Sequence, residues 1–286
     1  MENVAELAVH AYLEGVTHGE RQMSEETIKQ ITSDIEAALR RQFCERKEST
    51  GDFTLRASNV GRPVCQLWYQ KNKPDKAEPL TTTFVVRMMF GDMVEALFKG
   101  LLTESGVSYE GHDRVKTQIG SEEISGEYDL IVNGVVDDIK STSPWSYNNK
   151  FTDGKNLEKD DPFGYIGQLA VYSKGANVPA GGWWVVNQAS GQFKYVAYES
   201  DVDEVISKLK HTVDTLNRNE FVRCFEPEPE TFRGKATGNY TLSRHCSFCS
   251  FRRDCWNGAI LEEPSRVSQA KNKATVNYLD MEKVND

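Results

Sequence analysis

Two aspartates and a lysine stand in a pattern that could hydrolyse a phosphodiester bond. Asp138 and Lys140 end one β-prone stretch, and Asp129 begins the β-prone stretch that precedes it. Residues two apart on a strand point to the same face of a sheet, so Asp138 and Lys140 share a face. Asn133-Gly134, between the two stretches, is a strong signal for a β-hairpin. A turn there would bring Asp129 across from the other two side chains.

The chemistry that suits this grouping is metal-assisted attack of water on a phosphate. Carboxylate oxygens are the ligands that Mg²⁺ and Mn²⁺ prefer. A bound metal would polarise the phosphate and lower the pKa of the attacking water. The lysine ammonium would orient that water or offset charge growing on the transition state. The alternative is that these are solvated polar residues near a turn. An isolated match to such a pattern more often reflects solvated polar residues than an active site.

Three of the six cysteines are clustered near the C-terminal end. Cys246, Cys249 and Cys255 form a C-x₂-C-x₅-C run. In a chain without a secretory signal, clustered thiols indicate metal ligation before disulfides. A C-x₂-C pair lets two sulfurs reach one centre, and a third thiol completes most of a four-thiolate site. A fourth ligand is required, and ligand spacing alone does not separate an iron–sulfur cluster from Zn²⁺.

The elements that must position these residues follow from periodicity and turn signals. The order is helices, three strands, a helix, two strands and a helix, which indicates an α/β or α+β sheet covered by helices. The predicted helices cover residues 1–48 (with a second helix starting at Ser24), 82–102, 162–175 and 200–217, and the predicted strands 114–119, 124–132, 134–140, 183–186 and 193–196.

These motifs, in this order, resemble the PD-(D/E)XK nucleases, and specifically their RecB-like branch. The matching elements are the G-x-x-D that ends at Asp129, the D-x-K of Asp138 and Lys140, and the Q-x-x-x-Y of Gln168 and Tyr172. Gln168 and Tyr172 are four residues apart, so they share one helical face. The resemblance implies that this face looks into the active site and contacts substrate or the metal-bound water. It covers roughly residues 55 to 256.

One position departs from the family pattern. The branch has a G-x-x-x-H helix upstream of the core, and Gly91 is followed here by Glu95 in place of the histidine. A glutamate can ligate a divalent metal through oxygen, and related exonucleases use one. The resemblance therefore implies a Mg²⁺ or Mn²⁺ site formed by Glu95, Asp129 and Asp138. The alternative for Glu95 is a solvated helix residue.

The RecB-like branch includes iron–sulfur nucleases, among them CRISPR-associated and AddB-type exonucleases, with one cysteine before the core and three after it. Cys65, followed by an aromatic pair, is the best upstream match, with Cys44 the runner-up. Cys224 is isolated from the motif and is expected to be a small buried hydrophobe. The resemblance implies a [4Fe–4S] cluster, with structural Zn²⁺ as the alternative, held by Cys65, Cys246, Cys249 and Cys255.

The implied fold is a PD-(D/E)XK restriction-endonuclease-like core, in which helices flank a mixed central sheet. The expected division is an N-terminal helical region (1–54), a nuclease domain with its cysteine cluster (55–260) and a peripheral C-terminal tail (261–286). The implied function is a DNA exonuclease acting on single strands or duplex ends. The alternative is an inactive nucleic-acid-binding module that retains the fold and cluster, which the intact Asp129, Asp138 and Lys140 argue against.

Composition limits the partners. A net charge of −9 over 286 residues is unlike a protein that holds DNA by bulk charge alone, and lowers the expectation of a tight non-enzymatic binder. No stretch approaches eighteen apolar residues, so no membrane partner is expected. A cytoplasmic location is the default expectation without a signal peptide. Because helicase motifs are absent, a separate helicase or recombination partner is possible besides DNA itself.

Overall fold

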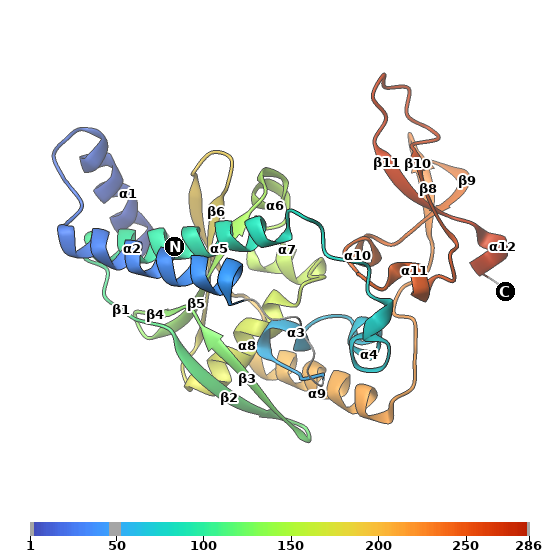
Figure 1. The fold of residues 1–286 in the computed structure, drawn as a ribbon, viewed down its shortest axis with the longest axis horizontal. Coiled ribbons are helices and arrows are strands. Elements are labelled where there is room, and N and C mark those ends of the chain that lie inside the picture. Colours follow the sequence, from blue (N-terminus) through green and yellow to red (C-terminus); the bar gives the residue numbers. More distant parts are fainter. Residues whose placement is uncertain (1–2, 46–52, 285–286) are drawn as a thin grey trace. The chain divides into compact units, whose positions relative to one another are not determined.

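The computed structural model describes residues 3–45 and 53–284 (Figure 1). The chain forms two compact units, the first made of Met1–Gly61 and Thr81–Asp214, the second of Arg62–Leu80 and Thr215–Asp286. None of the helices in these described ranges is both long enough and apolar enough to cross a membrane.

The first unit holds the helices and the mixed sheet that the sequence predicts. Its helices are α1 (Val4–Thr17), α2 (Glu25–Leu39), the π-helical turn η1 (Arg40–Cys44), α3 (Ala57–Val60), α5 (Phe84–Glu104), α6 (Pro144–Asn149), α7 (Gly154–Lys159), α8 (Tyr165–Ala176) and α9 (Val202–Arg218), whose last residues belong to the second unit. Its strands are β1 (Tyr109–Glu110), β2 (Asp113–Ile119), β3 (Glu122–Tyr128), β4 (Leu130–Val132), β5 (Val135–Thr142), β6 (Ala180–Asn187) and β7 (Phe193–Ala197).

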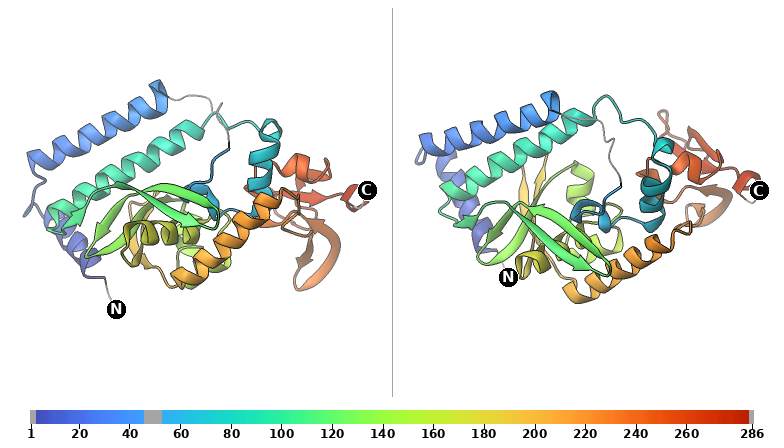
Figure 2. Two further views of the ribbon diagram at one scale, coloured as in Figure 1. Left: turned by 90° about the horizontal axis from the view of Figure 1, so that it is seen from below. Right: turned by 60° about the horizontal axis from the view of Figure 1, so that its bottom comes forward.

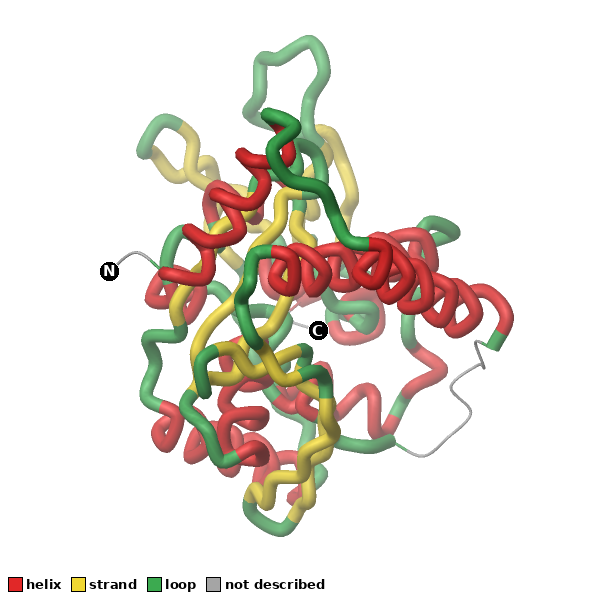
Figure 3. Tube along the Cα trace, turned by 90° about the vertical axis from the view of Figure 1, so that its left-hand side faces the viewer, coloured by secondary structure: helices red, strands yellow, loops and turns green. Residues whose placement is uncertain are grey.

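The main sheet has the strand order β1-β4-β5-β6-β7, and β2 pairs with β3 in a separate hairpin. β5 and β6 run parallel, whereas the other neighbours in the main sheet are antiparallel. The parallel pair needs a crossover connection, which α6, α7 and α8 provide. In Figure 3 the helices, in red, flank the yellow strands. The unit is therefore an α/β structure with a mixed sheet and flanking helices, as the sequence predicts at that level.

The predicted hairpin forms between β4 and β5. Asn133 and Gly134 both adopt left-handed conformations, with φ of 51° and 78°, as a two-residue type I′ turn requires. Val132 pairs with Val135, and Leu130 pairs with Asp137. The single strand predicted for 124–132 is broken at Asp129, which lies between β3 and β4.

Alternate residues of β5 face opposite sides of the sheet. Ile139 packs with Trp184 of β6 in a core that α1 and α5 cover. Asp137 lies on this same face, where its carboxylate accepts hydrogen bonds from Trp184 Nε1 at 3.0 Å and from Tyr195 Oη at 2.9 Å. Burial raises the pKa of Asp137 to about 7. Asp138 and Lys140 point to the other face, toward α8.

The helices α2 and α5 lie side by side, as both views in Figure 2 show. α2 begins at the predicted Ser24, whose side chain accepts a hydrogen bond from the backbone N–H of Thr27 at 3.2 Å. The two helices approach closely at Gly100, where a Cβ would lie 2.5 Å from Cδ1 of Ile31. This contact fixes α2 against the helix that carries Glu95.

The second unit contains a four-stranded antiparallel sheet in the order β10-β11-β9-β8. The predicted tail is thus not peripheral over its described residues 261–284, because Tyr278 of β11 is fully buried and its hydroxyl donates to Glu230 Oε1 at 2.8 Å. The elements of this unit are α4 (Val64–Asn72), the 3₁₀ turn η2 (Pro74–Lys76), β8 (Glu228–Phe232), β9 (Lys235–Thr241), α10 (Arg244–Ser247), α11 (Arg252–Cys255), β10 (Ile260–Pro264), β11 (Thr275–Leu279) and α12 (Met281–Val284).

Candidate functional site

The β4–β5 hairpin brings Asp129, Asp138 and Lys140 together, as the sequence predicts. Lys140 Nζ lies 2.6 Å from Asp138 Oδ2, and these side chains are only 19% and 3% exposed. Asp129 leaves the end of β3, and its Oδ2 accepts the backbone N–H of Ile139 at 2.7 Å. This hydrogen bond holds the Asp129 carboxylate beside β5, next to the Asp138–Lys140 pair.

The predicted helical pair on α8 contacts the same lysine. Lys140 Nζ donates to Gln168 Oε1 at 3.3 Å, and Gln168 Nε2 donates to the Tyr172 hydroxyl at 2.9 Å. Gln168 is therefore oriented from both sides. The D-x-K and Q-x-x-x-Y motifs therefore form one connected set of polar contacts between β5 and α8.

Tyr165 is a site residue that the sequence reasoning missed. Its ring centroid lies 5.0 Å from Lys140 Nζ, within the range of a cation–π interaction. A signal for it existed, because Tyr165, Gln168 and Tyr172 follow the i, i+3, i+7 spacing of one helical face.

The electrostatics of the site leave negative charge uncompensated. Burial raises the pKa of Asp129, and the nearby carboxylates of Asp138 and Glu95 raise it further. Burial also raises the pKa of Asp138, although Lys140 opposes this. Burial alone would lower the pKa of Lys140, but Asp138 and Asp129 outweigh it and raise that pKa, so the lysine stays charged. Hard oxygen ligands with excess negative charge suit a divalent cation such as Mg²⁺.

Glu95, on α5, faces the same region. It lines a cavity of about 630 Å³ together with Asp129, and α2 contributes part of the wall through Asp34, with Arg41 of η1 beside it. Glu95 Oε1 also accepts a hydrogen bond from Lys99 Nζ at 2.6 Å. In residues 3–45 and 53–284, no three histidine, cysteine, aspartate or glutamate side chains are already arranged to hold one ion. Joint ligation by Glu95, Asp129 and Asp138 therefore stays a prediction.

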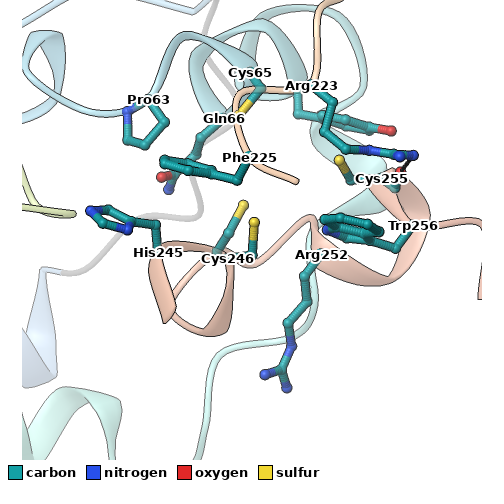
Figure 4. A pocket seen from close by; sticks show the side chains of 12 residues that line it. Pro63, Cys65, Gln66, Arg223, Phe225, His245, Cys246, Arg252, Cys255 and Trp256 are labelled. Carbon is teal, nitrogen blue, oxygen red and sulfur yellow. Dashed lines mark hydrogen bonds between the residues drawn. The ribbon is translucent and has the colours of Figure 1, made fainter. Parts of the chain in front are cut away.

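The second candidate site lies in the second unit and is built from thiols. One cavity of about 20 Å³ is lined by the four predicted ligands, Cys65, Cys246, Cys249 and Cys255. Figure 4 shows the sulfurs of Cys65, Cys246 and Cys255 around this space. The volume is about that of one water-sized sphere. Since no three of these side chains are already arranged around one ion in the described residues, holding an ion or a cluster would require the sulfurs to move. Cys44, the runner-up, is exposed on η1 of the first unit.

The surroundings of the thiols are aromatic and cationic. The Arg223 guanidinium lies over the Trp256 ring at 4.3 Å, and its Nη2 donates to the Cys255 carbonyl at 2.8 Å. The His245 ring stacks on Phe225 with centroids 4.7 Å apart and lines the same cavity. Thiolates beside a guanidinium suit both Zn²⁺ and an iron–sulfur cluster.

Cys224 is a fifth thiol of this group, and the expectation of an isolated hydrophobe is wrong. Its Sγ accepts the backbone N–H of Cys65 at 3.2 Å. The hydrogen bond from Cys65 lowers the pKa of the Cys224 thiol to about 7, and hydrogen bonding to Cys224 raises that of Cys65. Burial raises the pKa of Cys246 and of Cys255, and negative charge on Cys224 raises both further. No local spacing marks Cys224, because its place depends on α4 reaching the segment after α9.

Comparison with known proteins adds little to this geometry. No protein-family model and no curated protein matches the chain. A solved structure titled "Crystal structure of SSO0001" is similar over 80% of this chain and 96% of that chain, with 12% sequence identity and a TM-score of 0.39. A likeness at this level carries no argument about function.

Proposed function

We propose that this chain is a metal-dependent deoxyribonuclease with a PD-(D/E)XK core of the RecB-like type. The observation that carries the proposal is the continuous set of contacts from Asp138 through Lys140 and Gln168 to Tyr172. These residues come from two motifs on different elements, and a chance match in sequence gives no reason for them to touch. Asp129 joins them through Ile139, so a third motif reaches the same place.

Asp129, Asp138 and Glu95 are the residues that would hold Mg²⁺ or Mn²⁺. When bound, such an ion polarises the scissile phosphate and lowers the pKa of the attacking water. The buried position of Asp138, and its contact with Lys140, keep that carboxylate in one orientation. A ligand fixed in this way loses little conformational entropy when the ion binds.

Lys140 supplies a fixed positive charge at the site. Asp138 and Asp129 keep it protonated, and Gln168 and Tyr165 restrict where its ammonium can point. The ammonium is thus placed to donate a hydrogen bond to a phosphoryl oxygen or to orient a water molecule. Gln168 is oriented by Tyr172, so its amide can contact the substrate without free rotation.

For the second unit, we propose that Cys65, Cys246, Cys249 and Cys255 hold a [4Fe–4S] cluster, with Zn²⁺ as the alternative occupant. The convergence of the four thiols on one cavity supports this. Bound thiolates would hold the chain segment that carries Cys65 to the segment that carries the other three. The contribution proposed for this group is structural.

A digestion assay tests the nuclease proposal. The purified chain is incubated with end-labelled single-stranded and duplex DNA in Mg²⁺, in Mn²⁺ and in a chelator. We expect shortening of at least one substrate in the presence of metal and none in the chelator. Binding of DNA without cleavage under all metal conditions would instead favour the inactive nucleic-acid-binding module.

A further inference from the structure

Cys224 is a thiol that the proposed four-cysteine site leaves unassigned. Its sulfur lies at the N-terminus of α4, where the backbone N–H of Cys65 donates to it at 3.2 Å. The contact thus joins the Cys224 sulfur to the residue that carries the second thiol. This contact brings Cys224 next to Cys65, although the two residues are far apart in sequence.

The two thiols differ in accessibility. Cys65 is 8% exposed, whereas Cys224 is half-buried. A small reagent would therefore reach Cys224 more readily than Cys65. Access of the attacking thiol is one of the factors that set the rate of thiol–disulfide exchange, and a nearby second thiol can then resolve the mixed disulfide.

We infer that Cys65 and Cys224 form a reversible intramolecular disulfide when the metal-free chain meets a low-molecular-weight disulfide such as oxidised glutathione. In the first step, the Cys224 sulfur attacks one glutathione sulfur, forms a mixed disulfide and releases one glutathione thiol. In the second, the Cys65 sulfur attacks Cys224 Sγ and releases the second glutathione thiol. The two protein thiols are oxidised, and one glutathione disulfide is reduced to two thiols.

The disulfide would remove Cys65 from the proposed metal ligands. Cys246, Cys249 and Cys255 would then be left without their fourth thiolate, and metal binding would weaken. This consequence rests on the proposed metal site, whereas the disulfide itself depends on neither the metal proposal nor the nuclease proposal.

Peptide mapping of the full chain tests the inference directly. The chelator-treated protein is exposed to oxidised glutathione, its free thiols are alkylated, and it is digested with trypsin. Cys65 and Cys224 then lie in separate peptides, residues 57–71 and 224–233, and the other second-unit cysteines lie in residues 245–252 and 254–266. We expect a cross-link between 57–71 and 224–233 that disappears after reduction with dithiothreitol.

Two results would overturn the inference. One is a cross-link from residues 57–71 to 245–252 or 254–266 in place of 224–233. The other is recovery of both target peptides uncross-linked, including the case in which Cys224 carries glutathione alone. Because the mapping uses the unaltered chain, it stands even if a cysteine variant fails to fold.

Matched variants sharpen the result. In Cys224→Ser, Cys65 should remain alkylatable after the same treatment, whereas Cys44→Ser, at an exposed position in the first unit, should show the unchanged cross-link. Zn²⁺ uptake by the oxidised chain should fall at least tenfold and return after reduction. If the cross-link forms but Zn²⁺ uptake is undiminished, the disulfide inference stands and its proposed effect on the metal site is refuted.

Discussion

The Lys140 ammonium contacts three side chains at once: the Asp138 carboxylate, the Gln168 amide and the Tyr165 ring. Each contact restricts a different direction of movement. An ammonium that is held in this way needs no reorganisation when charge develops on a substrate, which is the main source of electrostatic catalysis. Lys140 is thus held by side chains from both β5 and α8.

Replacing Lys140 with alanine should lower metal-dependent DNA cleavage by about 10²–10³-fold, because one positioned donor to the developing charge is lost. The matched control is Lys116→Ala on β2, since Lys116 forms an ion pair of the same length, 2.6 Å, but at the surface. Initial rates on end-labelled DNA measure the effect. Cleavage by Lys140→Ala at the rate of the Lys116→Ala control would contradict the assigned site.

Asp129→Asn should abolish cleavage and yet stabilise the metal-free chain at neutral pH. Because the pKa of Asp129 is raised on folding, its ionisation destabilises the folded state at pH values above the ordinary carboxyl pKa. Asparagine removes this charge and can still accept the N–H of Ile139. The gain in stability should shrink as pH falls through the raised pKa and should vanish below the ordinary carboxyl pKa of about 4, where the carboxyl is protonated in both states.

Thermal unfolding of the metal-free variant and of the unaltered chain, between neutral pH and pH 4, measures this difference. A melting temperature below that of the unaltered chain at pH 7 would show that Asp129 is not destabilising. Adding Mg²⁺ should reduce the difference in melting temperature between the variant and the unaltered chain. The ion neutralises the repulsion between the carboxylates, and so stabilises the folded state, only when Asp129 is charged.

At the scale of elements, the glycine of the G-x-x-D motif is explained by packing. Gly126 lies on β3 where the strand meets both α3 and α8. A Cβ at this position would lie 2.5 Å from the Ala57 Cβ and 2.6 Å from Cε1 of Tyr172. The motif glycine therefore lets β3 approach the helix that carries Gln168 and Tyr172.

Gly126→Ala should destabilise the chain by about 1–3 kcal/mol through overpacking, and should slow cleavage by displacing Tyr172. Gly91→Ala is the matched control: Gly91 lies within α5, and a methyl group there would meet no neighbouring atom within 4 Å. That control should be neutral or stabilise by up to about 1 kcal/mol, since alanine favours helix. Denaturant unfolding measures the free energy of unfolding of both variants. Equal changes in Gly126→Ala and Gly91→Ala would refute the packing role of Gly126.

The elements that the sequence predicted well are those with local signals. The hairpin at Asn133-Gly134 was predictable, because both residues tolerate the left-handed conformation. The β8–β9 hairpin was not, because its turn places Arg233 in that conformation and Pro229 stands within β8. β8 is an edge strand, where a proline does not break a ladder between two neighbours. Edge position is a property of the folded sheet.

The candidate site divides in the same way. Asp138 and Lys140 share a face because of strand periodicity, and Gln168 and Tyr172 because of helical periodicity, so both pairs could be read from spacing. The two faces meet where Lys140 contacts Gln168. Cys224 could not be found, since its contact with Cys65 joins segments that only the tertiary fold brings together.

At the scale of the whole molecule, the second unit is assembled from two separated stretches of chain. Cys65 comes from Arg62–Leu80, and the C-x₂-C-x₅-C run comes from Thr215–Asp286. A metal held by all four thiols would close the long loop between residues 65 and 246. Closing a loop lowers the conformational entropy of the unfolded chain and so stabilises the folded one.

Cys65→Ser should therefore lose the bound iron or zinc and become more sensitive to proteolysis within residues 215–286, whereas Cys44→Ser should resemble the unaltered chain. Metal content per chain, measured after purification without oxygen, tests the loss of metal. Limited proteolysis tests the increased sensitivity to cleavage. Full metal content in Cys65→Ser would remove Cys65 from the ligand set, and loss of metal in Cys44→Ser would show that the site is wrongly assigned.

The alternation along β5 also bears on which strand pairing the chain adopts. If the β4–β5 hairpin slipped by one residue against β6, Asp138 would take the place of Asp137 beside Trp184, and the exchange of one aspartate for another would hardly be felt. Two residues further along β5, however, the slip would place Lys140 where Ile139 lies in the apolar core. This would bury an unpaired ammonium, so the slip is opposed there. Lys140 thus excludes the competing alignment as well as serving the site. A Lys140→Leu chain should populate both alignments, giving doubled amide resonances for β5, and a single set would show that the turn alone fixes the pairing.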